Sequence, residues 1–254
     1  MKTNKSNKSQ SESNKVLLID NLYKAFGENK VLNGFSLHLN EGENLVLMGR
    51  SGSGKSVLIK CLVGLLKPDK GKIEILNQNI STLSQSEMDE LRTSIGFLFQ
   101  GSALYDSMTV RENLEFPLRR HTGKLSSDEM ESLVFEALES VGLKHTVDLM
   151  PAELSGGMQR RIALARALIL KPKIIIYDEP TTGLDPITSK EIIELMNTVQ
   201  EKYKTSSLII THDVDCARVV SNRIILLLDG INYAEGTFKE LSSSDDNKIK
   251  AFFK

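Results

Sequence analysis

The sequence predicts an α/β fold in which a mostly parallel β-sheet carries helices on both faces and a helical subdomain is inserted. Between Ile174 and Leu228, apolar runs of strand length alternate regularly with helical patterns, as in parallel strands joined by helical crossovers. Between about Ser102 and Leu154 no convincing strand is found, and apolar residues recur at helical spacing. We therefore expect a helical subdomain at about residues 102–160, inserted in one domain that spans residues 16–242.

The individual elements follow from local patterns along the chain. Apolar residues alternate with polar ones over Val31–Leu39, which indicates a half-buried strand, whereas the uninterrupted apolar run Leu45–Met48 indicates a buried one. Ile95–Phe99 is also apolar, and we expect it to be a more central strand. The expected strands are Val16–Leu22, Val31–Leu39, Leu45–Met48, Lys72–Leu76, Ile95–Phe99, Ile174–Asp178, Ser207–Thr211, Arg223–Leu228 and Ile231–Glu235. The expected helices run from about Lys55 to Leu66, from a capping box at Ser126 to Gly142, from Thr188 to Tyr203 and from Val214 to Val220.

The composition is that of an ordinary globular protein. The chain has 254 residues, of which 40% are hydrophobic and 26% charged, and its formal net charge is −1. Such a charge gives no support to nucleic acid as a partner. Cys61 and Cys216 match no metal or redox spacing. We expect them to be buried structural thiols in a reducing compartment.

Neither end of the sequence indicates a membrane segment or a secretory signal. No apolar run approaches the roughly 18 residues of a membrane span, and Met1–Lys15 lacks the apolar core of a signal peptide. The Lys, Ser and Asn composition of residues 1–15 predicts a disordered tail. Residues 243–254 form a C-terminal tail in which Phe252 and Phe253 are candidates for docking on a neighbour. We expect a cytosolic protein whose membrane contacts are made through a partner.

The strongest functional signal is the segment Gly49-Arg50-Ser51-Gly52-Ser53-Gly54-Lys55-Ser56 between an apolar run and a helical pattern. Its spacing is that of a phosphate-binding loop, G-x-x-x-x-G-K-[S/T]. The glycines allow backbone amides to face inward, and the following helix adds the positive end of its dipole. Lys55 is expected to reach the β- and γ-phosphates, and the Ser56 hydroxyl to ligate Mg²⁺. The strand–loop–helix context disfavours an ordinary Gly/Ser turn, so we expect a nucleoside triphosphate here.

Two carboxylates follow the buried strand Ile174–Asp178. Ligands of such sheets lie at the carboxyl ends of the strands, which places Asp178 and Glu179 beside the phosphate loop. One carboxylate can hold Mg²⁺, usually through water, and the other can orient or deprotonate an attacking water. A plain helix-capping pair is the alternative, and the presence of the phosphate loop disfavours it.

A second anion site is indicated where Ser155-Gly156-Gly157 opens a helix, because such a terminus has free amides and little side-chain bulk. An ordinary Ser cap with flexible glycines is the alternative. The phosphate loop already surrounds its own nucleotide from one side, so the simplest use of the second site is to close over a nucleotide held by another subunit. For Arg160 and Arg161, on the same helix, a solvated helix face is the simpler interpretation.

The joint order of these motifs resembles the ATP-binding subunit of ABC transporters. The motifs are the phosphate loop, Gln100, LSGGMQRR at residues 154–161, IIIYDEP at residues 174–180, GLDP at residues 183–186 and THD at residues 211–213. The resemblance covers about Val16 to Gly236. It implies a P-loop ATPase core with a mixed sheet, an N-terminal antiparallel β-subdomain and a helical subdomain. It further implies ATP and Mg²⁺ as ligands, ATP hydrolysis, and a homodimer that drives a membrane permease.

The resemblance also assigns roles to particular residues. Phe26 is expected to stack on adenine, with Tyr23 as a rival. Residues 49–57 are expected to bind the phosphates, and Gln100 to contact Mg²⁺ and water. Asp178 is expected to bind the metal, Glu179 to act on the attacking water, and His212 to contact the γ-phosphate. The γ-phosphate held by the opposite subunit is expected to be contacted by Ser155, Gly156 and Gly157, and Asp185 is expected to reach across the dimer interface. Glu179, His212 and Gln100 are thus the expected catalytic residues, and Ser56, Gln100 and Asp178 the expected metal site.

Details of two segments resemble the Mla/Mce-type lipid-transport ATPases within this family. These details are Arg50 and Val57 in the phosphate loop and the run Gly101-Ser102-Ala103-Leu104-Tyr105-Asp106-Ser107-Met108. The resemblance implies an MlaE-like permease, an MCE-domain lipid-binding protein and phospholipid transport that maintains outer-membrane lipid asymmetry. It places the chain at the cytoplasmic face of the bacterial inner membrane. The ATPase of a polar amino-acid-type importer and a cell-division signalling ATPase remain the alternatives.

Overall fold

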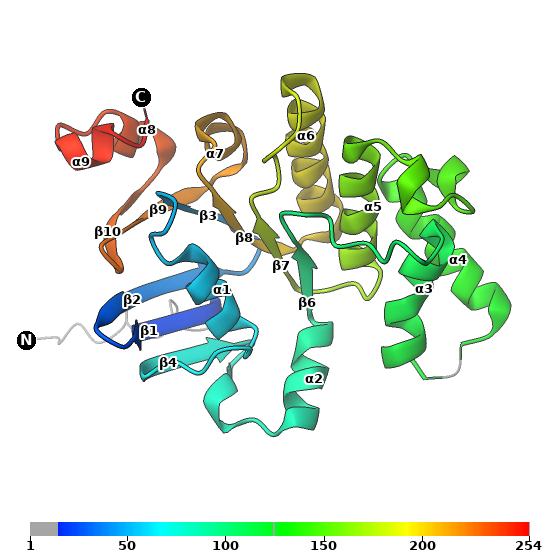
Figure 1. Ribbon diagram of the computed structural model, residues 1–254, viewed down its shortest axis with the longest axis horizontal. Coiled ribbons are helices and arrows are strands. Elements are labelled where there is room, and N and C mark those ends of the chain that lie inside the picture. The colour runs from blue at the N-terminus through cyan, green and yellow to red at the C-terminus, as the bar shows by residue number, and fades with distance from the viewer. Residues whose placement is uncertain (1–14, 124, 254) are drawn as a thin grey trace, which may run out of the picture.

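The computed structural model describes residues 15–123 and 125–253, which form two β-sheets and a group of helices (Figure 1). The N-terminal sheet is antiparallel and lies at one end of the molecule. Helices α3, α4 and α5 lie at the other end, and the larger sheet passes between them. This arrangement confirms the predicted α/β class with its antiparallel N-terminal part and its helical region.

The smaller sheet has four strands in the order β2-β1-β4-β5, all antiparallel. Its strands are β1 (Lys15–Phe26), β2 (Asn29–Asn40), β4 (Lys70–Ile75) and β5 (Gln78–Asn79). The larger sheet has six strands in the order β10-β9-β3-β8-β7-β6, parallel except for β10. Its strands are β3 (Asn44–Gly49), β6 (Ile95–Leu98), β7 (Ile174–Asp178), β8 (Ser206–Thr211), β9 (Arg223–Leu228) and β10 (Ile231–Gly236). The mixed sheet is therefore confirmed.

The two faces of the larger sheet belong to different cores, because successive side chains of a strand point to opposite faces. In β3, Leu45 and Leu47 face a core shared with the small sheet and with α1 (Lys55–Leu62). Val46 and Met48 face a core shared with α6 (Pro186–Tyr203) and α7 (Val214–Val220). Both faces of β3 are thus buried, which accounts for its uninterrupted apolar sequence.

The helical region has a core of its own. Its helices are α3 (Val110–His121), α4 (Ser127–Ser140) and α5 (Gly156–Leu168). The predicted capping box at Ser126 is present, with Glu129 donating its backbone N–H to the Ser126 hydroxyl and accepting from the Ser126 backbone N–H. Leu114, Leu138 and Ile162 are among the buried residues that hold the three helices together.

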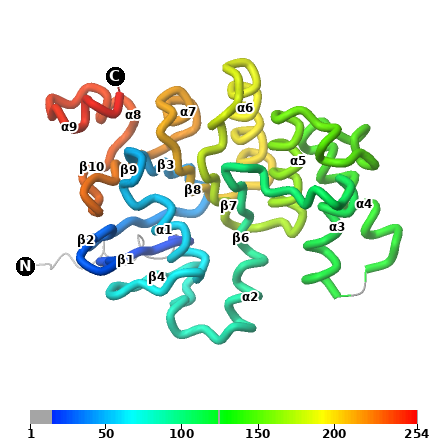
Figure 2. Tube along the Cα trace, in the orientation of Figure 1, coloured from blue at the N-terminus to red at the C-terminus, as the bar shows by residue number. Residues whose placement is uncertain are grey.

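The remaining elements are short. They are the 3₁₀ turns at Ile80–Thr82, Lys144–Thr146 and Pro151–Glu153, and the helices α2 (Gln85–Thr93), α8 (Phe238–Ser242) and α9 (Asn247–Lys250). Figure 2 shows that α8 and α9 follow β10 and lie at the same end of the molecule as the small sheet.

The structure corrects one expectation about the strands. Ile95–Leu98 is not a central strand: β6 is the edge strand of the large sheet, paired with β7 alone. Its apolar residues are explained by packing against α2 and α5. The tail predicted for residues 1–15 lies outside the described residues except for Lys15, which begins β1.

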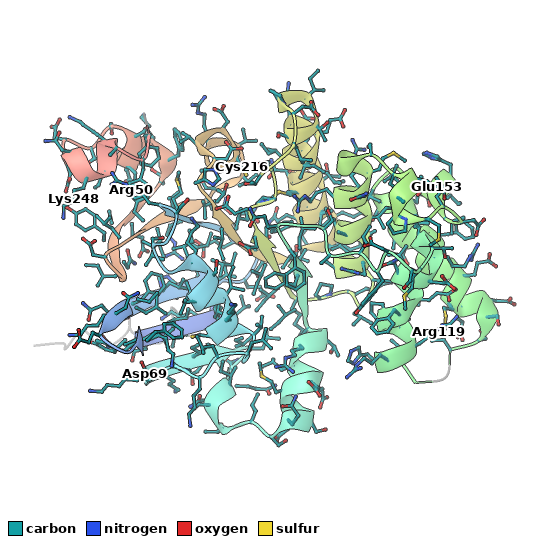
Figure 3. All side chains as sticks on the ribbon, viewed as in Figure 1. Arg50, Asp69, Arg119, Glu153, Cys216 and Lys248 are labelled. Carbon is teal, nitrogen blue, oxygen red and sulfur yellow. The ribbon has the colours of Figure 1, made fainter. Side chains whose placement is uncertain are left out.

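The C-terminal tail packs on its own chain. Phe253 meets Phe238 edge-on, with ring centroids 5.4 Å apart, and Phe252 packs against the same core. The Arg50 guanidinium lies 5.9 Å from the centre of the Phe252 ring, so the tail also touches the phosphate loop (Figure 3). Within the described residues, no helix is long and apolar enough to cross a membrane.

Candidate active site

The phosphate loop joins the end of β3 to the start of α1 and is shaped by its glycines. Gly52 and Gly54 adopt φ values of +79° and +105°, which side chains disfavour. At Gly49, an added Cβ would lie 2.5 Å from the Ser53 hydroxyl oxygen. The Lys55 ammonium turns back over the loop and donates to the Gly49 carbonyl oxygen at 2.6 Å. The loop is therefore built around small residues, with the lysine folded back over it, as a phosphate-binding loop requires.

Most of the predicted site residues meet at one cavity of about 460 Å³ beside this loop. Its lining consists of Phe26, Val31, Arg50, Ser51, Gly52, Gly54, Lys55, Ser56, Val57, Gln100, Asp178, Glu179 and His212. Gly49 and Ser53 frame the loop without lining the cavity. Val31 was missed by sequence reasoning, because its only signal is the apolar alternation of its strand.

Glu179 is the centre of the polar contacts in this cavity. One carboxylate oxygen lies 2.8 Å from His212 Nδ1 and accepts from the Thr182 hydroxyl at 3.2 Å. The other lies 3.4 Å from Lys55 Nζ. Glu179 itself has a φ of +50°, which is unfavourable for a residue with a side chain and recurs at functional sites. The carboxylate is therefore held between a histidine and the lysine that the phosphates are expected to engage.

Asp178 lines the same cavity and is half-buried. Burial, together with the neighbouring charge of Glu179, raises the pKa of Asp178 against the opposing effect of Lys55. Ser56 and Gln100 line the cavity with it, so a hydroxyl, an amide and a carboxylate are available. Oxygen donors of this kind suit Mg²⁺, which keeps several waters and uses few protein ligands beside substrate phosphates. The three residues therefore fit the predicted metal site.

Four further predicted nucleotide-binding residues, Ser155, Gly156, Gly157 and Asp185, do not line this cavity. Ser155 caps its own helix by accepting from the Met158 backbone N–H, and Gly157 lies so close to Thr188 that an added Cβ would be 2.5 Å from Thr188 Cγ2. Asp185 caps α6, and hydrogen bonds from Thr188 lower its pKa. Ser155–Gly157 (the signature loop) and Asp185 thus form a second surface, apart from the phosphate loop.

Comparison with known proteins identifies the family. Residues 32–182 match the sequence profile of the family described as ABC transporter. The chain belongs to this family. Its fold agrees, because the ATP-binding cassette MJ0796, solved as a dimer in a post-hydrolysis state bound to ADP and Pi, is 34% identical. That similarity has a TM-score of 0.79 and covers 88% of this chain and 99% of the other. The chain is therefore an ABC ATPase with ATP and Mg²⁺ as its ligands, and we propose the cavity beside the phosphate loop as its ATP site.

Individual relatives differ in their transport systems. The chain is 37% identical to the intermembrane phospholipid transport system ATP-binding protein MlaF of Haemophilus influenzae, over 94% of this chain and 90% of that protein. It is 36% identical to the methionine import ATP-binding protein MetN of Campylobacter jejuni, over 93% and 75% of the two chains. A probable ribonucleotide transport ATP-binding protein, mkl, of Mycobacterium leprae is 40% identical. The chain spans only 65–67% of the length of the mycobacterial relatives.

Replacing Asp178 by Asn is expected to raise the stability of the nucleotide-free protein and to weaken its use of Mg²⁺. The pKa of Asp178 is raised on folding, so its ionised form costs stability, and the contribution of Asp178 to wild-type stability falls as pH rises from the ordinary value of 3.8 through the raised one. The nucleotide-free Asn variant should therefore unfold at a higher temperature than wild type at neutral pH. Its hydrolysis should need about 10–100-fold more Mg²⁺. Thermal unfolding between about pH 4 and 7 and Mg²⁺ titrations of turnover test both parts.

Phe26 and Tyr23 are the two candidates for stacking on adenine, and substitutions distinguish them. Phe26 lines the cavity with 51% of its surface exposed, whereas the Tyr23 ring packs over Gly34. Because aromatic stacking on a base contributes about 1–3 kcal/mol, Phe26→Ala should raise the Kd for ATP about tenfold, and Phe26→Tyr should restore it. Tyr23→Ala is the control and should leave ATP affinity unchanged. A larger loss in Tyr23→Ala would transfer the stacking role to Tyr23.

Proposed function

We propose that this chain is the ATPase subunit of an Mla/Mce-type phospholipid transport system. It works as a homodimer on an MlaE-like permease at the cytoplasmic face of the bacterial inner membrane, and an MCE-domain protein receives or delivers the lipid. In this role it helps to maintain the lipid asymmetry of the outer membrane. The similarity to the Haemophilus phospholipid-transport protein over 90% of that protein's length supports the proposal.

The observation that carries the choice of partner is the segment 101–108 and the surface beside it. Tyr105 in this segment is 44% exposed and packs on the exposed Phe116, with ring centroids 5.0 Å apart. Nearby in sequence, Phe99 is 45% exposed and packs on Phe97 at 4.1 Å. Large aromatic side chains that stay exposed in the ATPase are expected to be covered by a partner.

A groove of about 380 Å³ adjoins Phe99 and gives the permease a place to dock. Its lining is mostly apolar and consists of Ser56, Ile59, Lys60, Val63, Leu65, Arg92, Ile95, Phe97, Phe99 and Asp178. Leu65, at its rim, is 72% exposed. Ser56 and Asp178 belong to both this groove and the ATP cavity. A permease helix seated here would therefore lie against the metal site, which offers a direct path from nucleotide state to transport.

The second candidate function is amino-acid import. The similarity to the Campylobacter methionine-import protein, almost as high as that to the phospholipid-transport protein, favours it. The two candidates share the ATPase chemistry and differ in the permease that occupies the groove.

Affinity purification of the tagged chain from its own membranes tests the proposal. Phospholipid transport predicts co-purification of an MlaE-like permease and an MCE-domain protein, and stimulation of ATP turnover when the complex is placed in phospholipid bilayers. Recovery of an amino-acid-type permease would overturn it in favour of import, and a peptidoglycan-associated partner would favour the division role. Leu65→Asp should abolish co-purification, whereas Val219→Asp, at a 55% exposed position on α7 away from the groove, should not.

A further inference from the structure

The segment that contains Gln100 follows β6 and leads to the helical region. Within it, Ser102 and Ala103 adopt φ values of +58° and +52°, and Ser102 is only 7% exposed. Two consecutive residues with side chains in this region cost conformational energy, so other parts of the molecule must hold the segment in place. At Gly101, by contrast, an added Cβ would meet nothing within 4 Å. The segment is therefore fixed at its ends and open at Gln100–Gly101.

Arg160 holds the segment immediately before Gln100. Its side chain comes from α5, is only 4% exposed, and donates from Nη1 to the Phe99 carbonyl oxygen at 2.6 Å. Nη2 donates to the Thr182 carbonyl oxygen at 3.3 Å, in the loop that leads from Glu179 to Asp185. The expected solvated position is thus wrong for Arg160. One planar guanidinium joins α5 to two loops of the ATP site.

Arg166 holds the same segment just beyond Gly101, at Ser102 and Ala103. It lies six residues further along α5, and its Nη2 donates to the carbonyl oxygens of Ala103 at 2.8 Å and Ser102 at 3.4 Å. Its Nη1 donates to the side-chain oxygen of Asn113 at 3.3 Å, and its guanidinium lies 5.7 Å from the centre of the Tyr105 ring. The two arginines of α5 therefore donate hydrogen bonds to backbone carbonyl oxygens on both sides of Gln100.

Burial of both arginines costs free energy because their charged groups lose contact with water. Burial lowers the pKa of Arg160 and of Arg166, which means that each charged group is poorly solvated. Among the described contacts Arg160 bonds only to carbonyl oxygens, and its buried Nε–H has no partner. A well-packed apolar residue would usually be at least as stabilising at such a position. A contribution to stability therefore does not explain why arginine occupies these buried positions, whereas positioning of the loops that it bonds does.

We propose that Arg160 and Arg166 are positioning residues that fix Gln100 to the helix carrying the signature loop. The signature loop forms the N-terminus of α5, so any displacement of α5 also displaces the carbonyl oxygens that flank Gln100. Through Thr182, Arg160 passes the same displacement to the loop that follows Glu179. Occupancy of the signature loop by a partner's nucleotide is thereby coupled to the position of Gln100 in the chain's own ATP cavity.

Arg160→Met and Arg160→Lys distinguish positioning from packing. Met keeps most of the side-chain volume and donates no hydrogen bond, whereas Lys keeps the charge and donates from a single nitrogen, which cannot occupy both positions held by Nη1 and Nη2 of Arg160. We expect kcat for ATP to fall about tenfold or more in Arg160→Met and less in Arg160→Lys, with KM within about twofold of wild type in both. A packing role predicts the reverse order, with Met close to wild type, and would overturn the proposal.

Arg161 provides the matched control on the same helix. Its side chain pairs with Glu191 on α6 and touches neither loop, so Arg161→Met should keep wild-type kcat. A kcat loss in Arg161→Met equal to that in Arg160→Met would indicate general damage to α5 and contradict the proposal.

A double-mutant cycle with Gln100→Ala measures the coupling between Arg160 and Gln100 in kcat, which a purely structural role of Arg160 would not produce. If Arg160 acts through Gln100, the loss in kcat caused by Arg160→Met should largely disappear in the Gln100→Ala background. Losses that multiply in the double variant would overturn the proposal. If Arg160→Met does not fold, the same cycle with Arg160→Lys decides the question.

Discussion

Glu179→Gln is expected to bind ATP and to hydrolyse it about 10²–10⁴-fold more slowly than wild type, the range that loss of a general base produces. The neutral amide of Gln accepts a proton poorly, so the water that attacks the γ-phosphate loses its base. ATP affinity should rise, because Lys55 no longer has the Glu179 carboxylate 3.4 Å from its ammonium and is free to bind phosphate. Single-turnover hydrolysis and equilibrium binding of ATP measure the two effects separately.

The same variant makes a prediction about Asp178. The charge of Glu179 contributes to the raised pKa of Asp178, so its removal should shift that pKa downward. Mg²⁺-dependent ATP binding should then persist to lower pH in Glu179→Gln than in wild type. Glu191→Gln, which removes a carboxylate on the outer surface of α6, is the control and should change neither turnover nor this pH dependence. Wild-type turnover in Glu179→Gln would remove Glu179 from the proposed mechanism.

The phosphate loop and the strand-end carboxylates could be predicted because their signals are local. The glycine spacing from Gly49 to Gly54 fixes the shape of one loop, and the position of Asp178 at the end of a parallel strand fixes the side of the sheet on which it lies. Both signals depend only on neighbouring residues and on general rules of sheet topology. They were enough to predict most of the residues that line the cavity.

Other features depend on contacts between distant parts of the chain. The apolar sequence of Ile95–Leu98 is compatible with a central strand or with an edge strand covered by helices, and only the fold decides between them. Arg160 and Arg161 are identical in sequence terms, yet one is buried against carbonyl oxygens and the other pairs with an acid on α6. The carbonyl partners of Arg160 lie 61 and 22 residues away in the sequence, so no local pattern marks them.

Ser155→Asp is expected to reduce turnover about 10²-fold or more. The substitution acts on the ATP site of the partner subunit, to which the signature loop of the variant chain contributes. Asp caps a helix as well as Ser does, so α5 should remain folded, but its carboxylate would repel the γ-phosphate of the partner's ATP. Ser155→Asn is the matched control, since Asn also caps the helix and adds no charge. It should retain far more activity than Ser155→Asp at the same protein concentration.

Mixing Ser155→Asp with the inactive Lys55→Met should restore activity if each ATP site combines the phosphate loop of one chain with the signature loop of the other. One site of the mixed dimer then carries both defects and the other carries neither. With random exchange of subunits at equal amounts, about a quarter of all sites should be intact. ATP retention and turnover should rise to about that level. If neither rises above the sum of the separate variants while mixed dimers form, each site is complete within one chain. The separation of Ser155 from the ATP cavity in the single chain favours the shared arrangement.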